Sequence, residues 1–193
     1  PKRFKRAKKY LQDKGFNIIE GNLTGKHDFY RSGTIKERAE ELNELIRNPK
    51  IKCIISTIGG MNSNSILPYI DYEAFKRNPK IIIGYSDITA ILLAIYAQTR
   101  INTYYGPALV ASFGELPPFV DYTYKYFKEI LVDNTELPYS FNMPEFWSDE
   151  YINWSTQDRE KERRANSWIK VCDGIARGRV IGGNLNTIEG IWG

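Results

Sequence analysis

A five-residue segment that occurs twice most strongly limits the folds open to this chain. Residues 47–51 and residues 77–81 both read Arg-Asn-Pro-Lys-Ile. Each copy closes a helical pattern and leads into an apolar, β-branched run, of which Ile81, Ile82 and Ile83 form the clearest. Buried strands of a parallel sheet have such continuous apolar runs, because helices cover both faces of the sheet. The repeat therefore predicts an α/β protein with a parallel sheet flanked by helices.

Helical and strand-like patterns alternate along the chain as far as residue 132. Helices are predicted at four places: residues 2–14, the segment after Thr34, the segment from Ile88, and residues 119–132. Glu37 follows the cap Thr34 at the spacing of a capping box. Strands are predicted at four places: residues 16–19, 51–57, 81–83 and 103–105. This alternation is typical of β/α units around one sheet.

The composition divides the chain into three parts. Residues 1–135 are expected to form an N-terminal α/β domain. Residues 136–167 carry two tryptophans and a run of mixed charge without clean periodicity, which predicts a long loop or linker. Strand-like runs at residues 168–172 and 178–181 predict that residues 168–193 begin a smaller β-rich domain. Since the chain starts inside a helical pattern and ends as a new unit begins, we expect it to be part of a longer protein.

The composition excludes several classes of protein. The chain has 193 residues, 42% of them hydrophobic and 26% charged, which is too apolar for a disordered chain. No apolar run is long enough for a membrane span, and no signal-peptide core is present. The two cysteines are too few for a disulfide framework and too far apart for a metal site, which favours a cytoplasmic protein without metal or cofactor.

The net charge of +4 comes from a basic N-terminal segment. Its cations are Lys2, Arg3, Lys5, Arg6, Lys8 and Lys9. They could form a nucleic-acid-binding arm. Because Phe4, Ala7 and Leu11 recur at helical spacing, the preferred interpretation is the solvated face of an amphipathic helix. We therefore expect neither a nucleic-acid partner nor a membrane partner.

The most distinctive strand end reads Gly84-Tyr85-Ser86-Asp87. In parallel sheets ligands bind at the carboxyl ends of strands. A serine on a tight strand-to-helix turn presents its hydroxyl as a nucleophile, and nearby backbone N–H groups can stabilise an oxyanion. The second glycine of the usual elbow pattern is replaced by Ile88. Ser86 or Asp87 could instead simply cap the following helix.

A second strand end carries Gly59 and Gly60, which let backbone N–H groups approach a ligand closely. The segment lacks the lysine of a phosphate-binding loop and the third glycine of a dinucleotide site. The single histidine, His27, could serve Ser86 as a base. Its polar surroundings favour an ordinary surface loop, so a base for Ser86 is not expected within this chain.

Four motifs together resemble the LD-carboxypeptidase family of serine peptidases. They are Ile58-Gly59-Gly60, residues 83–89, Tyr105-Gly106-Pro107, and residues 181–185, in the order and rough spacing of the family. The aromatic loop around Trp147 and Trp154 and the ending at residues 186–193 are most similar to the microcin C self-immunity branch.

The resemblance implies a function for each motif. Ser86 would be the nucleophile, the backbone N–H groups of Gly60 and Asp87 would form the oxyanion hole, and no metal or cofactor would be needed. The family also has a glutamate and a histidine in its triad, in motifs expected beyond residue 193. Neither Glu189 nor His27 is assigned to those roles. The first strand of the family would precede Pro1.

The resemblance also implies a substrate site and an assembly. In the immunity branch a loop tryptophan stacks on the nucleotide base, and Trp154 matches it best; alternatively, Trp154 packs the loop onto the sheet or a partner. Tyr85 and Asn184 are further candidates for substrate binding. A homodimer is implied.

Three classes of function remain open. The first is a hydrolase that cleaves a peptidyl-nucleotide of the microcin C type through an acyl-enzyme on Ser86. Its alternative substrate is the LD bond of a muropeptide tetrapeptide, as in murein recycling. The second class is a non-catalytic module that binds a small peptide or nucleotide. The third is nucleic-acid binding through the basic helix.

Overall fold

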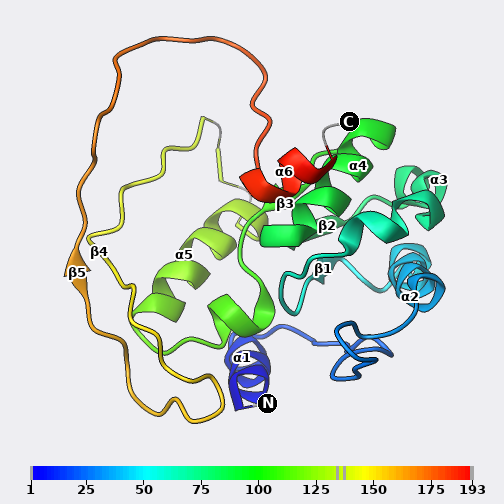
Figure 1. Ribbon diagram of the computed structural model, residues 1–193, viewed down its shortest axis with the longest axis horizontal. Helices are drawn as coiled ribbons and strands as arrows, with labels where there is room; N and C mark the ends of the chain where they lie inside the picture. Colours follow the sequence, from blue (N-terminus) through cyan, green and yellow to red (C-terminus); the bar gives the residue numbers. More distant parts are fainter. Residues whose placement is uncertain (1, 134, 137, 192–193) are drawn as a thin grey trace.

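The computed structural model describes residues 2–133, 135–136 and 138–191, so Pro1, Trp192 and Gly193 lie outside the described part (Figure 1). Its main sheet contains β1 (Cys53–Ile55), β2 (Ile81–Gly84) and β3 (Tyr104–Tyr105) in that order. Both pairings are parallel. The expected parallel α/β sheet is confirmed.

The two copies of the repeat lie side by side at the start of neighbouring strands. The side-chain amide of Asn78 donates to the Ile46 carbonyl at 3.0 Å. Lys80 donates to the carbonyls of Asn48 and Ile51, both at 2.8 Å, and its side chain is almost fully buried. The second copy therefore satisfies the carbonyl groups that the first copy leaves free where its helix ends.

Helices cover both faces of the sheet (Figure 1). One face packs on α2 (Ile35–Arg47), the 3₁₀ helix Ser63–Tyr69, α3 (Tyr72–Arg77) and α4 (Thr89–Thr99). The other packs on α1 (Lys2–Asp13), the π-helical turn Leu109–Phe113 and α5 (Phe119–Leu131). Ile82 belongs to the first core and Ile83 to the second. Because successive strand residues face opposite ways, the apolar run supplies both cores.

The capping box at α2 is confirmed. The Thr34 hydroxyl accepts a hydrogen bond from the Glu37 N–H at 3.2 Å, and the Glu37 carboxylate accepts one from the Thr34 N–H at 2.8 Å. The helices predicted from Ile88 and over residues 119–132 are present as α4 and α5.

The strand predicted over residues 16–19 is wrong. This segment forms no ladder, and β1 is an edge strand of the sheet as described. Phe16 and Ile18 pack their side chains against the second core instead. The alternation of apolar residues over 16–19 therefore reflects the packing of Phe16 and Ile18 against the core, and not pairing with another strand.

The strands predicted over residues 168–172 and 178–181 are also wrong for this structure. Both segments belong to a long, exposed, irregular segment that arches away from the sheet (Figure 1). Within the described residues no neighbouring strand accepts their backbone hydrogen bonds. Residues 138–167 are mainly irregular, with a short antiparallel ladder between β4 (Phe146–Trp147) and β5 (Arg164–Ala165). The last helix of the described residues is α6 (Leu185–Ile191).

The basic N-terminal segment forms α1 as predicted, but its charged residues do not all face solvent. Lys2, Lys5 and Lys9 are exposed, whereas Arg3 is only 1% exposed. The solvated-face interpretation is therefore wrong for Arg3, which an ion pair allows to be buried. None of the helices over the described residues is long and apolar enough to cross a membrane.

Candidate active site

Ser86 lies on a sharp turn between the end of β2 and the start of α4. Its backbone φ is 58°, in the left-handed region that residues other than glycine rarely adopt. Its N–H donates to the Tyr105 hydroxyl at 3.4 Å, across the neighbouring strand β3. Ser86 is partly exposed, and within the described part of the chain its backbone N–H makes this bond while its hydroxyl makes none to the start of α4. This is the geometry of a nucleophile elbow.

The double-glycine turn after β1 lies directly against this elbow. A Cβ atom on Gly59 would be 2.7 Å from the Ser86 Cβ, so any side chain there would displace the serine. A Cβ atom on Gly60 would be 3.3 Å from the Asp87 carboxylate. The two strand ends that the sequence singled out are therefore adjacent in space.

The Asp87 side chain ties the two turns together. One carboxylate oxygen, Oδ2, accepts hydrogen bonds from the N–H groups of Asn62 and Ser63, both at 2.8 Å. Asp87 is 8% exposed. Its side chain therefore does not cap α4, as the sequence allowed, but fixes the double-glycine turn beside the nucleophile.

Two backbone donors remain available next to Ser86. Among the described residues, neither the Gly60 N–H nor the Asp87 N–H has a hydrogen-bond acceptor. One belongs to the double-glycine turn and the other to the first turn after the serine. Two such donors, fixed before a substrate binds, can stabilise the charge on a carbonyl oxygen under attack.

Two tyrosines lie beside the elbow. The pKa of Tyr85 is raised by burial and by Tyr105, while the positive charge of Arg3 opposes that shift. Tyr85 is therefore a neutral hydroxyl at physiological pH. Tyr105 is half exposed at the end of β3.

Asn184 returns to the same end of the sheet from the far end of the chain. Its N–H donates to the Thr89 hydroxyl in the first turn of α4 at 2.9 Å. Its side-chain oxygen accepts the Thr187 N–H at 3.0 Å and so caps α6. The backbone of Asn184 therefore lies close to the helix that follows Ser86, while its side-chain oxygen is already engaged.

Trp154 packs against a buried ionic cluster. The Arg3 guanidinium lies over its ring, 4.8 Å from the ring centroid. Arg3 is also ion-paired with Glu115 and donates to Gln157 at 2.8 Å. The sequence analysis missed this cluster. Its burial could have been predicted from helical spacing, because Arg3 lies on the same face of α1 as Ala7 and Leu11, and that face packs on the core.

The residues excluded as a base for Ser86 lie apart from it. His27 is exposed in the loop before α2, and Glu189 is in α6. Within the described part of the chain, no hydrogen bond joins any histidine or carboxylate to the Ser86 hydroxyl. The described residues thus place a serine hydroxyl beside two backbone N–H groups without an acceptor, and no histidine or carboxylate is hydrogen-bonded to that hydroxyl.

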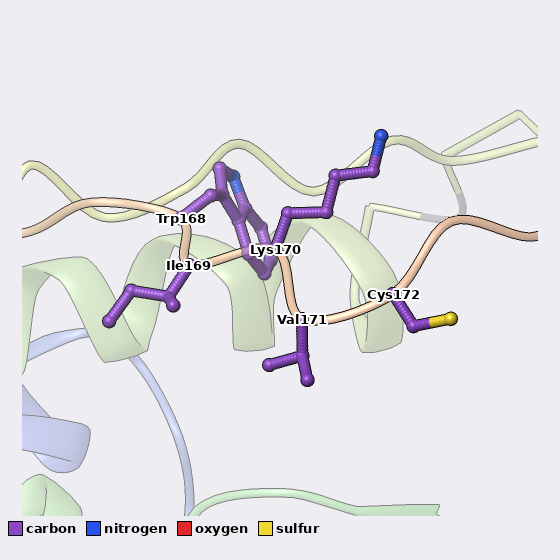
Figure 2. Close-up of a pocket in the computed structure, with 5 residues that line it drawn as sticks. All are labelled: Trp168, Ile169, Lys170, Val171 and Cys172. Carbon is purple, nitrogen blue, oxygen red and sulfur yellow. The ribbon is translucent and has the colours of Figure 1, made fainter.

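The hollow drawn in Figure 2 is separate from the elbow. It lies beside the side chains of a single extended segment, residues 168–172. Figure 2 shows these side chains projecting from the segment, and Trp168 is 83% exposed. A hollow made by one exposed segment does not enclose a ligand, and it carries no argument about the site.

Comparison with known proteins agrees with the motifs. The sequence profile of the LD-carboxypeptidase N-terminal domain matches residues 1–106. A Vibrio cholerae protein named as a carboxypeptidase is 59% identical over 193 residues, which are 100% of this chain and 58% of that protein. The Escherichia coli microcin C7 self-immunity protein MccF is 58% identical, over 99% of this chain and 56% of its own length. The chain thus spans less than two thirds of these relatives.

Solved structures give the same result. MccF without ligand superposes with a TM-score of 0.92 at 57% identity, over 100% of this chain and 58% of that chain. Other MccF structures are described as complexes with aspartyl sulfamoyl adenosine and, for a tryptophan-to-phenylalanine variant, with adenosine monophosphate. A Pseudomonas aeruginosa murein tetrapeptide carboxypeptidase is 29% identical over 79 residues, 40% of this chain and 25% of that protein.

Proposed function

Since this chain belongs to the LD-carboxypeptidase family, we propose that it carries the nucleophile and oxyanion hole of a serine hydrolase. The observation that carries this proposal is the left-handed backbone of Ser86, held at the end of β2 beside two free N–H groups. A helix cap would not require this strained backbone. A non-catalytic binding module would not require it either.

The proposed reaction is an acyl transfer. The Ser86 oxygen attacks the carbonyl carbon of a substrate amide, and the N–H groups of Gly60 and Asp87 donate to the oxygen that becomes negative. The C–N bond then breaks, which leaves an ester on Ser86 and releases the amine. Water hydrolyses the ester. The expected histidine, oriented by the expected glutamate, takes the serine proton and gives it to the leaving nitrogen.

The proposed substrate is a small peptidyl-nucleotide of the microcin C type. MccF is described in complexes with aminoacyl sulfamoyl nucleosides and with adenosine monophosphate. The serine and the tryptophan altered in its variants are as many positions apart as Ser86 and Trp154 are here. This spacing supports Trp154 as the residue that stacks on the base. Tyr85, next to Ser86, and Asn184, whose backbone bonds Thr89 in the first turn of α4, are proposed to bind the substrate nearer the scissile bond.

The second candidate substrate is a muropeptide tetrapeptide, cleaved before its terminal D-alanine. The similarity to a murein tetrapeptide carboxypeptidase supports it. That substrate carries no nucleotide base. The two candidates therefore differ in their need for Trp154.

The test compares the complete gene product with three variants on both substrates, with products followed by mass spectrometry. Ser86→Ala should abolish all cleavage. Trp154→Ala should impair cleavage of an aspartyl-adenylate conjugate and leave tetrapeptide cleavage unchanged. Trp147→Ala, in the same loop, is the matched control and should affect neither. Cleavage retained by Ser86→Ala would reject the proposed nucleophile, and equal losses on both substrates in Trp154→Ala would reject the stacking role.

The wider organisation is part of the same proposal. We propose that residues 1–135 form the nucleophile domain, that residues 136–167 form a substrate loop, and that residues 168–193 begin the C-terminal domain. We also propose a homodimer that acts in the cytoplasm, where a peptidyl-nucleotide antibiotic would reach its target. Light scattering of the complete gene product would reveal the oligomeric state.

A further inference from the structure

Arg3 is the most deeply buried cation of α1, and its guanidinium lies over the ring of Trp154. We propose that Arg3 is a positioning residue that fixes the plane of Trp154 and thereby sets the affinity for the nucleotide base. This inference rests on the nucleotide role proposed above for Trp154. Arg3 itself would not touch the substrate.

The contacts of Arg3 tie three separate segments together. Its Nε donates to the Gln157 side-chain oxygen at 2.8 Å, and its guanidinium is ion-paired with Glu115. Gln157 is fully buried, and its amide nitrogen donates to the Glu115 carboxylate. We call these three residues the Arg3 cluster. It joins helix α1, the segment after the π-helical turn and the loop that carries Trp154.

The cluster holds the part of the loop next to Trp154. The Gln157 N–H donates to the Asn153 carbonyl at 2.9 Å, which closes a turn around the tryptophan. Arg6 donates to the Gln157 carbonyl at 2.7 Å from the same helix. The turn that contains Trp154 is therefore fixed through the backbone of Gln157, a residue whose side chain is fully buried. A loop fixed in this way loses less conformational freedom when a ligand binds.

The stacking geometry also fixes which face of the ring is available. The guanidinium occupies one face of the half-buried indole, so a planar base would have to stack on the opposite face. Trp147 provides a contrast within the same loop. Arg164 lies 5.7 Å from its ring centroid, and the Arg164 side chain is more than half exposed. A cation bound to buried partners holds an aromatic ring more firmly than one that, like Arg164, is mostly exposed and paired only with the half-exposed Asp149.

Arg3 also connects Trp154 to the nucleophile region. Its positive charge acts on the hydroxyl of Tyr85, the residue before Ser86. Arg3 therefore lies within electrostatic reach of the elbow while it contacts the tryptophan.

The test measures binding of adenosine monophosphate to the complete gene product by calorimetry. Arg3→Lys keeps a positive charge beside Glu115 but loses the planar fork that reaches both Gln157 and the ring. We expect affinity to fall by about twofold to thirtyfold, the range between an exposed and a desolvated cation–π contact. In a Trp154→Ala background the same substitution should have no further effect. Lys9→Ala, an exposed cation of α1, is the control and should bind as wild type.

Kinetics separate positioning from a general structural defect. Arg3→Lys should raise KM for the adenylate substrate without lowering kcat, and should leave both constants for the tetrapeptide unchanged. If Arg3→Lys does not fold, Gln157→Met keeps the Arg3–Glu115 pair, releases the loop and should give the same selective effect.

Three outcomes would overturn the inference in distinguishable ways. Normal binding by Trp154→Ala would reject the proposed nucleotide role itself. Weaker binding by Trp154→Ala together with normal binding by the folded cluster variant would reject only the role of Arg3. Equal losses of kcat/KM for the adenylate and the tetrapeptide substrates in the cluster variant would show that the Arg3 cluster only supports the fold.

Discussion

Ser86 combines a reactive position with an unfavourable backbone. A residue with a Cβ atom at φ 58° is strained, and such strain costs on the order of 1–3 kcal/mol. Ser86 can lie this close to the double-glycine turn only because Gly59 has no side chain, since a Cβ atom there would be 2.7 Å from the Ser86 Cβ. The account predicts that this strain is retained for activity rather than for stability.

Two substitutions at Ser86 measure that strain. Ser86→Gly and Ser86→Ala both remove the hydroxyl and should both abolish cleavage, but only glycine relaxes the left-handed backbone. We expect Ser86→Gly to be more stable than Ser86→Ala by about 1 kcal/mol in urea unfolding. Equal stability of the two variants would show that the backbone at this position is not strained.

Of the residues around Ser86, the sequence predicted which strand ends lie together but not the contacts that support them. The double-glycine turn and the serine motif are adjacent in the structure, while the catalytic roles of Ser86, Gly60 and Asp87 stay predictions. The second role of the Asp87 side chain, as an acceptor for Asn62 and Ser63, depends on a contact between two strand ends. No local pattern encodes a contact of that kind, so the sequence left it open.

The Arg3 cluster links α1 to the Trp154 loop through one buried carboxylate. Burial opposes ionisation of Glu115, but hydrogen bonds from Gln157, the Leu116 N–H and Arg3 outweigh it and lower the pKa of Glu115. A carboxylate with a lowered pKa in the folded protein contributes stability above its ordinary pKa. That contribution is lost as the pH falls through the folded value.

Acid unfolding therefore tests this link. Glu115→Gln cannot ionise, so its deficit in unfolding free energy relative to wild type should be largest near neutral pH. The deficit should shrink as the pH falls below about 4.5, the ordinary value for glutamate. Urea unfolding at a series of pH values measures it, with Glu73→Gln on the exposed side of α3 as the control. A deficit that does not change with pH would contradict an ionised Glu115 in the folded protein.

Prediction of individual elements succeeded where periodicity and local contacts agree. The cap at Thr34 depends on residues within one helical turn, and it is present as predicted. The strand predictions over residues 16–19, 168–172 and 178–181 were wrong, because forming a strand requires a neighbouring strand and an apolar run does not specify one. The prediction that Arg3 faces solvent was wrong for a similar reason, because the partners that allow its burial, Glu115 and Gln157, are far away in sequence.

For the molecule as a whole, the sheet determines where chemistry can occur. Both faces of the three strands are covered by helices, so their carboxyl ends are the places where side chains and backbone N–H groups remain accessible. The double-glycine turn, the serine elbow and Tyr105 all lie at this edge. The repeat in the sequence was sufficient to predict this arrangement, because it marks two neighbouring units of the sheet.

The most direct test of the central claim is covalent labelling of the nucleophile. The complete gene product would be treated with a phosphonylating probe for activated serines, digested, and analysed by mass spectrometry. The account predicts one added phosphonyl group, on the peptide that contains Ser86, and none in the Ser86→Ala protein. Labelling of a different serine, or no labelling of the folded wild-type protein, would contradict the assignment of Ser86 as an activated nucleophile.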